Sequence, residues 1–160
     1  MITTAFSNEL SSFGSSLHRG NFPTHRLTVK DLESKQGSEV HSKLEELIRL
    51  NQGWDGYTGQ PVSLDKAMFA LSLLGAVCAE NTPAPQVIPT ARGEIQLEWH
   101  TETTDIELLV KAPNKVHAWR ECTLPNEHIE EEFDLTTNFI IIAQWIKSMQ
   151  EENIALALAA

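Results

Sequence analysis

The chain has 160 residues, of which 41% are hydrophobic and 21% charged, and its formal net charge at pH 7 is −10. These values are typical of one globular domain that buries a real core. No apolar run reaches the roughly 18 residues of a membrane-spanning helix, and the acidic charge disfavours direct binding to a nucleic-acid backbone.

The N-terminal region differs in character from the rest of the chain. Residues 1–37 are rich in serine, are interrupted by glycine and proline, and carry a formal charge of +1, whereas residues 38–160 carry −11. We therefore predict a loosely ordered arm over 1–37 and a single domain over 38–160. No secretory signal is recognisable at the start, and Cys78 and Cys122 lack paired spacing. Reduced thiols and a cytoplasmic location are expected.

Two helices are expected before residue 80. The first begins at Ser38 and runs to about Leu50, because apolar residues recur there at helical spacing. The second begins after Ser63, a candidate N-cap, and ends before Pro83. Its core stripe is predicted to consist of Leu64, Met68, Leu71 and Leu74, widened by Phe69, Leu73 and Val77.

Alternation with a period of two then predicts strands. The segments "EIQLEWH" and "TDIELLVK" alternate apolar and polar residues, "NKVHAWRE" does so more weakly, and "QVIPT" is an expected edge strand because Pro89 has no amide hydrogen. The sequence therefore predicts an antiparallel meander of three or four strands with one apolar and one polar face. Packed against about three helices, it gives a two-layer α+β domain.

The segment "ECTLPNEHIEEEFD" contains six acidic residues and no lysine or arginine. Two interpretations remain open: a solvated acidic loop, or a docking strip for a basic partner formed by Glu127, Glu130, Glu131 and Glu132. A last helix is expected to begin near Asp134 or Thr136. Its apolar end, "NIALALAA", indicates possible homo-oligomerisation through this helix.

The segment "NQGWDGYTGQP" places Trp54, Asp55 and Tyr57 on a glycine-rich turn between the two helices. A structural interpretation has Asp55 accept hydrogen bonds from turn amides, while the indole of Trp54 donates to an acceptor such as Asp55. A functional interpretation makes Trp54 and Tyr57 the anchors of a recognition loop, which together with Glu98 and Trp99 forms one joint site.

Strand alternation also groups polar side chains on one face of the predicted sheet. Glu98 and His100 lie two residues apart and share a face, and His117 and Trp119 do the same on a later strand. A carboxylate beside a histidine is compatible with acid–base chemistry. A solvated polar face and a partner-binding surface give the same pattern, so all three interpretations stay open.

A resemblance covers roughly residues 44–120. Over this stretch the segments "GWDGY" and "GEIQLEW", separated by prolines, resemble the signature of a family of small uncharacterised bacterial proteins. Thr58 departs from that pattern, in which a further glycine is usual. The resemblance implies no activity and no cofactor.

The sequence favours a non-catalytic interaction protein of bacterial or phage origin, such as an antitoxin, an immunity protein or an inhibitor. Phosphate-loop, metal-ligand and nucleophile motifs are lacking, so no cofactor and no metal site are predicted. The candidate partner-binding residues are Trp54, Asp55, Tyr57, Glu98, His100 and Trp119. Two alternatives remain: a small-ligand-binding protein or hydrolytic enzyme that uses Asp55, Glu98 and His100, and a structural subunit of a larger assembly.

Overall fold

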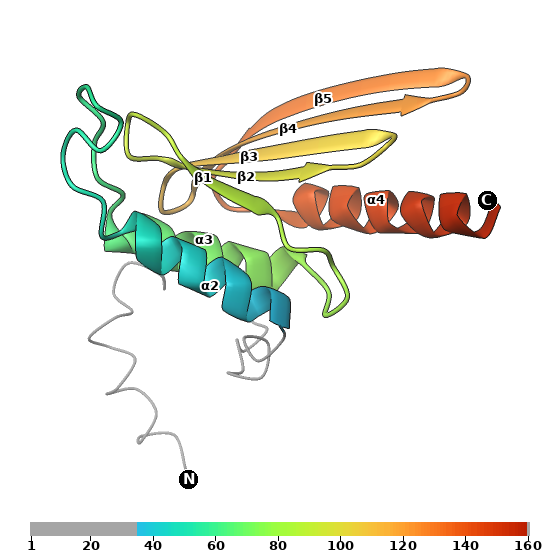
Figure 1. Cartoon of the computed structure of the whole chain (residues 1–160). Helices are drawn as coiled ribbons and strands as arrows, with labels where there is room; N and C mark the ends of the chain where they lie inside the picture. Colours follow the sequence, from blue (N-terminus) through green and yellow to red (C-terminus); the bar gives the residue numbers. More distant parts are fainter. Residues whose placement is uncertain (1–34, 160) are drawn as a thin grey trace, which may run out of the picture.

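The computed structural model describes residues 35–159, with side chains from residue 37 onward. This part of the chain forms the helices α2 (Lys35–Leu47), α3 (Leu64–Val77) and α4 (Ile140–Ala159) and the strands β1 (Gln86–Pro89), β2 (Ile95–His100), β3 (Thr104–Ala112), β4 (Lys115–Leu124) and β5 (Glu127–Leu135). The strands form one antiparallel sheet in the order β1-β2-β3-β4-β5. All three helices lie on one side of it (Figure 1), which confirms the two-layer α+β prediction.

The first described helix agrees with the predicted one apart from its ends. α2 begins at Lys35 and ends at Leu47, so it is shifted toward the N-terminus by three residues at both ends. The apolar residues that recur at helical spacing include Val40, Leu44 and Leu47, and all three are buried. Residues 1–34 of the predicted arm lie outside the described residues.

The α3 helix is capped as predicted, and of its predicted core residues it buries Phe69, Leu73, Leu74 and Val77. Ser63 Oγ accepts a hydrogen bond from the Lys66 amide at 3.4 Å. Leu64, predicted in the core stripe, is 50% exposed, while Met68 and Leu71 are only half-buried. The core face consists of Ala67, Phe69, Ala70, Leu73, Leu74 and Val77. Apolar residues of α3 occur on all sides of the helix, so their spacing alone does not identify which side is buried.

Strands β2, β3 and β4 bury alternate residues, as their sequence patterns predict. Their apolar side chains point toward the helices, and their polar ones point away. Trp99 lies on the helix side, where it is 3% exposed and its indole nitrogen donates to the Pro83 carbonyl at 2.8 Å. Near α4 the aromatic ring of Phe139 packs edge-to-face on Phe69 of α3, with ring centroids 6.0 Å apart.

The acidic segment forms the end of β4, a tight turn and most of β5, so it is not the solvated loop that was one of its two interpretations. β5 pairs with β4 without a register shift, from Leu124 opposite Glu127 to Val116 opposite Leu135. Its alternation was hidden because glutamates occupy both faces of the strand. The sheet therefore has five strands rather than three or four.

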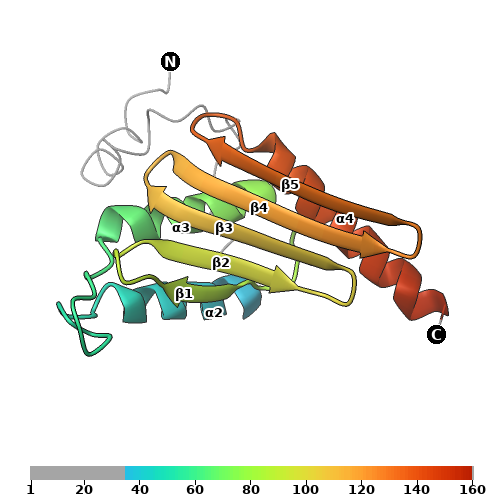
Figure 2. The same ribbon diagram turned by 90° about the horizontal axis from the view of Figure 1, so that it is seen from above.

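The last helix begins later than predicted, because β5 continues to Leu135. Asn138 precedes it, and its Oδ1 accepts a hydrogen bond from the Ile140 amide at 3.0 Å. Trp145 of α4 is 1% exposed and lies against Phe133 of β5, with ring centroids 5.8 Å apart. α4 thus covers the part of the sheet that α2 and α3 leave free, as the view from above shows (Figure 2).

Candidate functional site

The side of the sheet opposite the helices is the candidate functional site, and none of the described helices covers it (Figure 2). We call it the open face. Its residues on β2 to β5 are Gln96, Glu98, His100, Asp105, Glu107, Leu109, Lys111, His117, Trp119, Glu121, Thr123, His128, Glu130, Glu132 and Asp134. This set contains seven carboxylates and one ammonium group, so its formal charge is −6 when the histidines are neutral.

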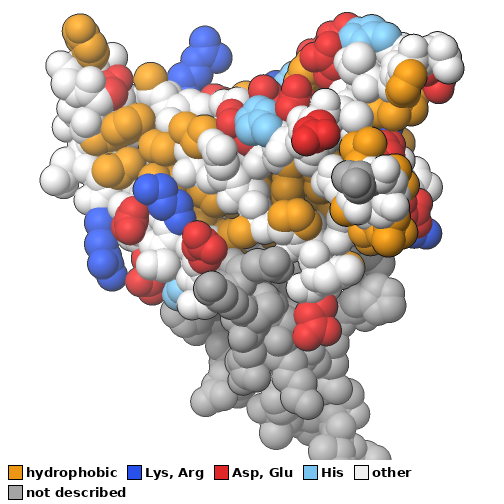
Figure 3. Space-filling view, turned by 45° about the vertical axis from the view of Figure 1, so that its right-hand side comes forward, with side chains coloured by type: hydrophobic (Ala, Val, Ile, Leu, Met, Phe, Trp, Pro, Cys, Tyr) orange, Lys and Arg blue, Asp and Glu red, His pale blue; other side chains and the backbone are white. Residues whose placement is uncertain are grey.

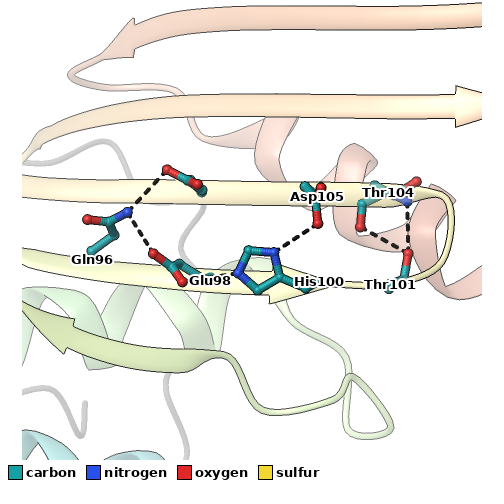
Figure 4. Close-up of polar contacts among 7 residues, drawn as sticks. Gln96, Glu98, His100, Thr101, Thr104 and Asp105 are labelled. Atoms are coloured by element: carbon teal, nitrogen blue, oxygen red, sulfur yellow. Dashed lines mark hydrogen bonds and ion pairs between the residues drawn. The ribbon is translucent and has the colours of Figure 1, made fainter.

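One end of the open face holds a histidine between two carboxylates (Figure 4). His100 Nε2 lies 3.0 Å from Glu98 Oε2, and His100 Nδ1 lies 2.8 Å from Asp105 Oδ1 on the neighbouring strand. These hydrogen bonds, first that with Glu98 and then that with Asp105, raise the pKa of His100 above its ordinary value. The ring remains accessible, with 44% of the side chain exposed.

The neighbouring carboxylates are kept in place by an amide. Glu98 and Glu107 are directly opposite each other on β2 and β3. Gln96 Nε2 donates to Glu98 Oε1 at 2.7 Å and to Glu107 Oε2 at 3.1 Å. This bridge offsets the repulsion between two like charges on adjacent strands.

A second histidine site lies across β4 and β5. His117 Nε2 is 3.1 Å from Glu132 Oε1, and His117 Nδ1 is 3.2 Å from Asp134 Oδ1. Lys111 also contacts Asp134, at 3.1 Å. Lys111 and then His117 lower the pKa of Asp134, so this carboxylate stays ionised under ordinary conditions.

Trp119 stands among these charged groups near the middle of the face. Its indole nitrogen donates to Glu130 Oε1 at 3.1 Å, and in the register it lies between Glu107 and Glu132. The ring of Trp119 is half-buried. Leu109, also half-buried, is the other large apolar residue of the open face. The face therefore combines a small apolar centre with an acidic surround.

The glycine-rich turn forms a self-contained structure at a different place. Asp55 Oδ1 accepts hydrogen bonds from the amides of Tyr57 and Gly59, both at 2.9 Å, and these bonds lower the pKa of Asp55. The Trp54 indole donates to the Gln60 carbonyl at 3.0 Å rather than to Asp55. The Tyr57 side chain points into solvent and is 87% exposed.

This turn does not share a site with Glu98 and His100. It is fixed to the β1–β2 turn, where the Gln60 amide donates to the Ala91 carbonyl at 2.9 Å. His100 lies at the far end of β2, about 17 Å along the strand from Ile95 at some 3.3 Å per residue. The joint site expected from the sequence is therefore not formed, and Asp55 does not converge with Glu98 and His100.

The acidic strip is divided between the two sides of β5. Glu130 and Glu132 lie on the open face, whereas Glu131 points to the helix side, where its Oε2 is 3.9 Å from Nη1 of buried Arg120. Glu127 is exposed beside the β4–β5 turn. The candidate residues predicted from the sequence did not include Asp105, Glu121, His128 and Asp134. The alternation of "TDIELLVK" nevertheless places Asp105 on the same face as Glu107.

The surface is hollowed next to His100. A depression of about 440 Å³ is lined by His100, Thr101, Glu102, Asn153, Leu156 and Ala157, and a second of about 150 Å³ shares His100 and Thr101 with it. In the space-filling view, acidic and histidine side chains gather along the top of the molecule, while apolar side chains surround the end of α4 (Figure 3).

Comparison with protein-family models, curated proteins and solved structures finds no significant match to this chain. The resemblance of the "GWDGY" and "GEIQLEW" segments to a bacterial family therefore stays a prediction. Within residues 35–159, no cluster of three or more histidine, cysteine or acidic side chains is arranged to bind a metal ion. In the same part of the chain, no helix combines the length and the apolar character needed to cross a membrane.

Proposed function

We propose that this chain is a non-catalytic protein-interaction module that binds a basic partner through the open face of its sheet. The observation that carries the proposal is the charge of that face, which holds seven carboxylates and the single ammonium group of Lys111. Most of these carboxylates have only histidines, amides or an indole as partners. Such a surface attracts lysine and arginine side chains and repels phosphates.

The apolar centre gives the proposed interface its anchor. Trp119 is fixed by its hydrogen bond to Glu130 and is partly accessible, and tryptophan is among the residues that dominate binding hot spots. An acidic face of this kind suits an antitoxin, an immunity protein or an inhibitor whose target carries a basic surface. These classes, together with a bacterial or phage origin and a cytoplasmic location, belong to the proposal.

The experiment starts with affinity capture from the organism that encodes the chain, with the full chain as bait. The captured protein is then purified, and its affinity is measured by calorimetry at about 50 and 200 mM salt. We expect binding that weakens with salt and that is lost in Trp119→Ala. Tyr57→Ala is the control, because Tyr57 is an aromatic residue outside the open face and is more exposed than Trp119. Equal effects of both variants would refute the proposal.

A second candidate function is that of a subunit in a larger assembly. The end of α4 is apolar on all sides: Ile154, Leu156 and Leu158 are 56%, 41% and 84% exposed, and no charge follows Glu152. A helix with this pattern is normally buried. Sedimentation equilibrium of Leu158→Glu should then show a smaller species than the parent chain, whereas Gln144→Glu, also exposed on α4, should change nothing.

A further inference from the structure

The outer edge of β5 is the long free edge of the sheet. β5 has nine residues and only β4 as a neighbour. The opposite edge, β1, has four residues, and one of them is Pro89, which has no amide hydrogen. An exposed strand edge is a template for a further strand, and nothing in residues 35–159 pairs with that of β5.

The register shows which amides of β5 point outward. The Thr123 amide donates to the Thr103 carbonyl on the β3 side, at 2.8 Å. Thr123 and His128 are therefore a non-hydrogen-bonded pair of the β4–β5 ladder. Antiparallel pairs alternate, and this ladder has no bulge. The amides that point away from β4 are therefore those of His128, Glu130, Glu132 and Asp134.

Charge decides against a second copy of this chain as the occupant of that edge. The outward amides belong to residues whose side chains lie on the open face, and three of those side chains are carboxylates: Glu130, Glu132 and Asp134. Two such edges side by side would place like charges opposite each other, which is destabilising. A strand with lysine or arginine on this side would instead find opposite charges.

The helix side of the same edge is apolar and incompletely covered. Phe133 points to this side and contacts Trp145, yet it is 40% exposed. Ile129 lies on the same side of β5 and is half-buried. A neighbouring strand with apolar side chains on this side would complete the cover of Phe133, because alternate residues of a strand face opposite sides.

We propose that the free edge of β5 binds an extended segment of a partner protein as a sixth strand, and that this segment alternates basic and apolar residues. The inference rests on the proposed function and gives its binding mode. Main-chain hydrogen bonds to the outward amides supply affinity, and the alternating side chains supply specificity.

The test uses a fluorescein-labelled peptide, (Lys-Val)4, with the full chain, and measures anisotropy. Glu132→Gln and Glu132→Pro both remove the charge, but only proline also removes the outward amide. Proline is tolerated at sheet edges, and circular dichroism checks that each variant keeps its fold. We expect Glu132→Gln to weaken binding about 2–5-fold, as for a surface ion pair, and Glu132→Pro to weaken it at least tenfold more.

Two methylated peptides test the same point on the unchanged protein. One carries N-methyl groups on its lysines and the other on its valines. Only one of these two sets of residues points its main-chain amides toward β5. In an antiparallel arrangement that set is the lysines, and in a parallel arrangement it is the valines. Methylation of that set should abolish binding, and methylation of the other set should be tolerated.

The outcomes separate this inference from the proposed function. Salt-sensitive binding that Glu132→Gln and Glu132→Pro weaken equally, and that is indifferent to which residues are methylated, would overturn strand addition and leave the acidic face as the binding surface. No peptide binding and no effect of Trp119→Ala on partner capture would overturn both. A dimer of this chain that Glu132→Pro dissociates would also overturn the inference.

Discussion

Gly93 joins the glycine-rich turn to the sheet, and its replacement by alanine tests that junction. Gly93 has φ +67°, and an added Cβ would lie 2.5 Å from the Pro61 carbonyl oxygen and 3.2 Å from Gln60 Cβ. The left-handed conformation costs alanine about 1–2 kcal/mol. Displacing a main-chain carbonyl adds roughly 1–3 kcal/mol, as overpacking does elsewhere. We expect Gly93→Ala to lower the free energy of unfolding by about 2–5 kcal/mol.

The matched control is Gly56→Ala. Gly56 has φ +84°, and nothing lies within 4 Å of its added Cβ, so this variant bears the conformational cost alone. Urea unfolding with unchanged slope measures both variants. The melting temperature of Gly93→Ala should fall by roughly 3–4 °C for each kcal/mol. Equal destabilisation of the two variants, within about 0.5 kcal/mol, would refute the close junction between Pro61 and the β1–β2 turn.

Three further predictions concern single side chains. Because Glu98 and Asp105 raise the pKa of folded His100, its contribution to stability is present below the ordinary histidine pKa and is lost as pH rises through the raised value. The unfolding free energy of the His100→Gln variant should lack this decline with pH. An NMR titration of His100 that gives an ordinary pKa would contradict the reasoning. Asp55→Ala removes the acceptor of two turn amides, so hydrogen exchange at Tyr57 and Gly59 should become faster while exchange in β3 does not change; unaltered exchange at both amides would show that they are protected by other means. Burial raises the pKa of the Cys78 thiol to about 12, and Cys122 is buried, so a thiol reagent at pH 8 should modify both cysteines slowly until denaturant is added; immediate reaction of two thiols in the native chain would count against the described packing.

The strands were predictable where one face of the sheet is apolar and the other polar. In β2, alternation correctly placed Ile95, Leu97 and Trp99 inward, and it placed Glu98 and His100 together on the other face. In β5 the same rule failed, because Glu131 occupies an inward position, where it contacts Arg120. The sequence around Glu131 does not show that its charge is paired with Arg120 on the neighbouring strand, so the strand pattern could not be recognised.

The candidate site was predictable only in part, since it depends on register. Alternation grouped residues within a strand, but the contact of His100 with Asp105 also requires the short turn between β2 and β3. Similarly, the contact of His117 with Glu132 and Asp134 required a fifth strand. Asp55 accepts hydrogen bonds from turn amides, as its place among glycines predicted, whereas the acceptor of the Trp54 indole depends on turn geometry that sequence alone does not specify.

The late position of α4 in the chain has a consequence for folding during synthesis. Each strand of the meander pairs with its sequence neighbour, so the sheet is built from local contacts that form rapidly. α4 is different: Phe139, directly before it, packs on Phe69 of α3, and Gln150 of α4 contacts Thr82, 68 residues earlier. A nascent chain that has released the sheet but not α4 exposes the apolar underside of β3 to β5 to solvent or to a chaperone. The core is therefore complete only once α4 has left the ribosome.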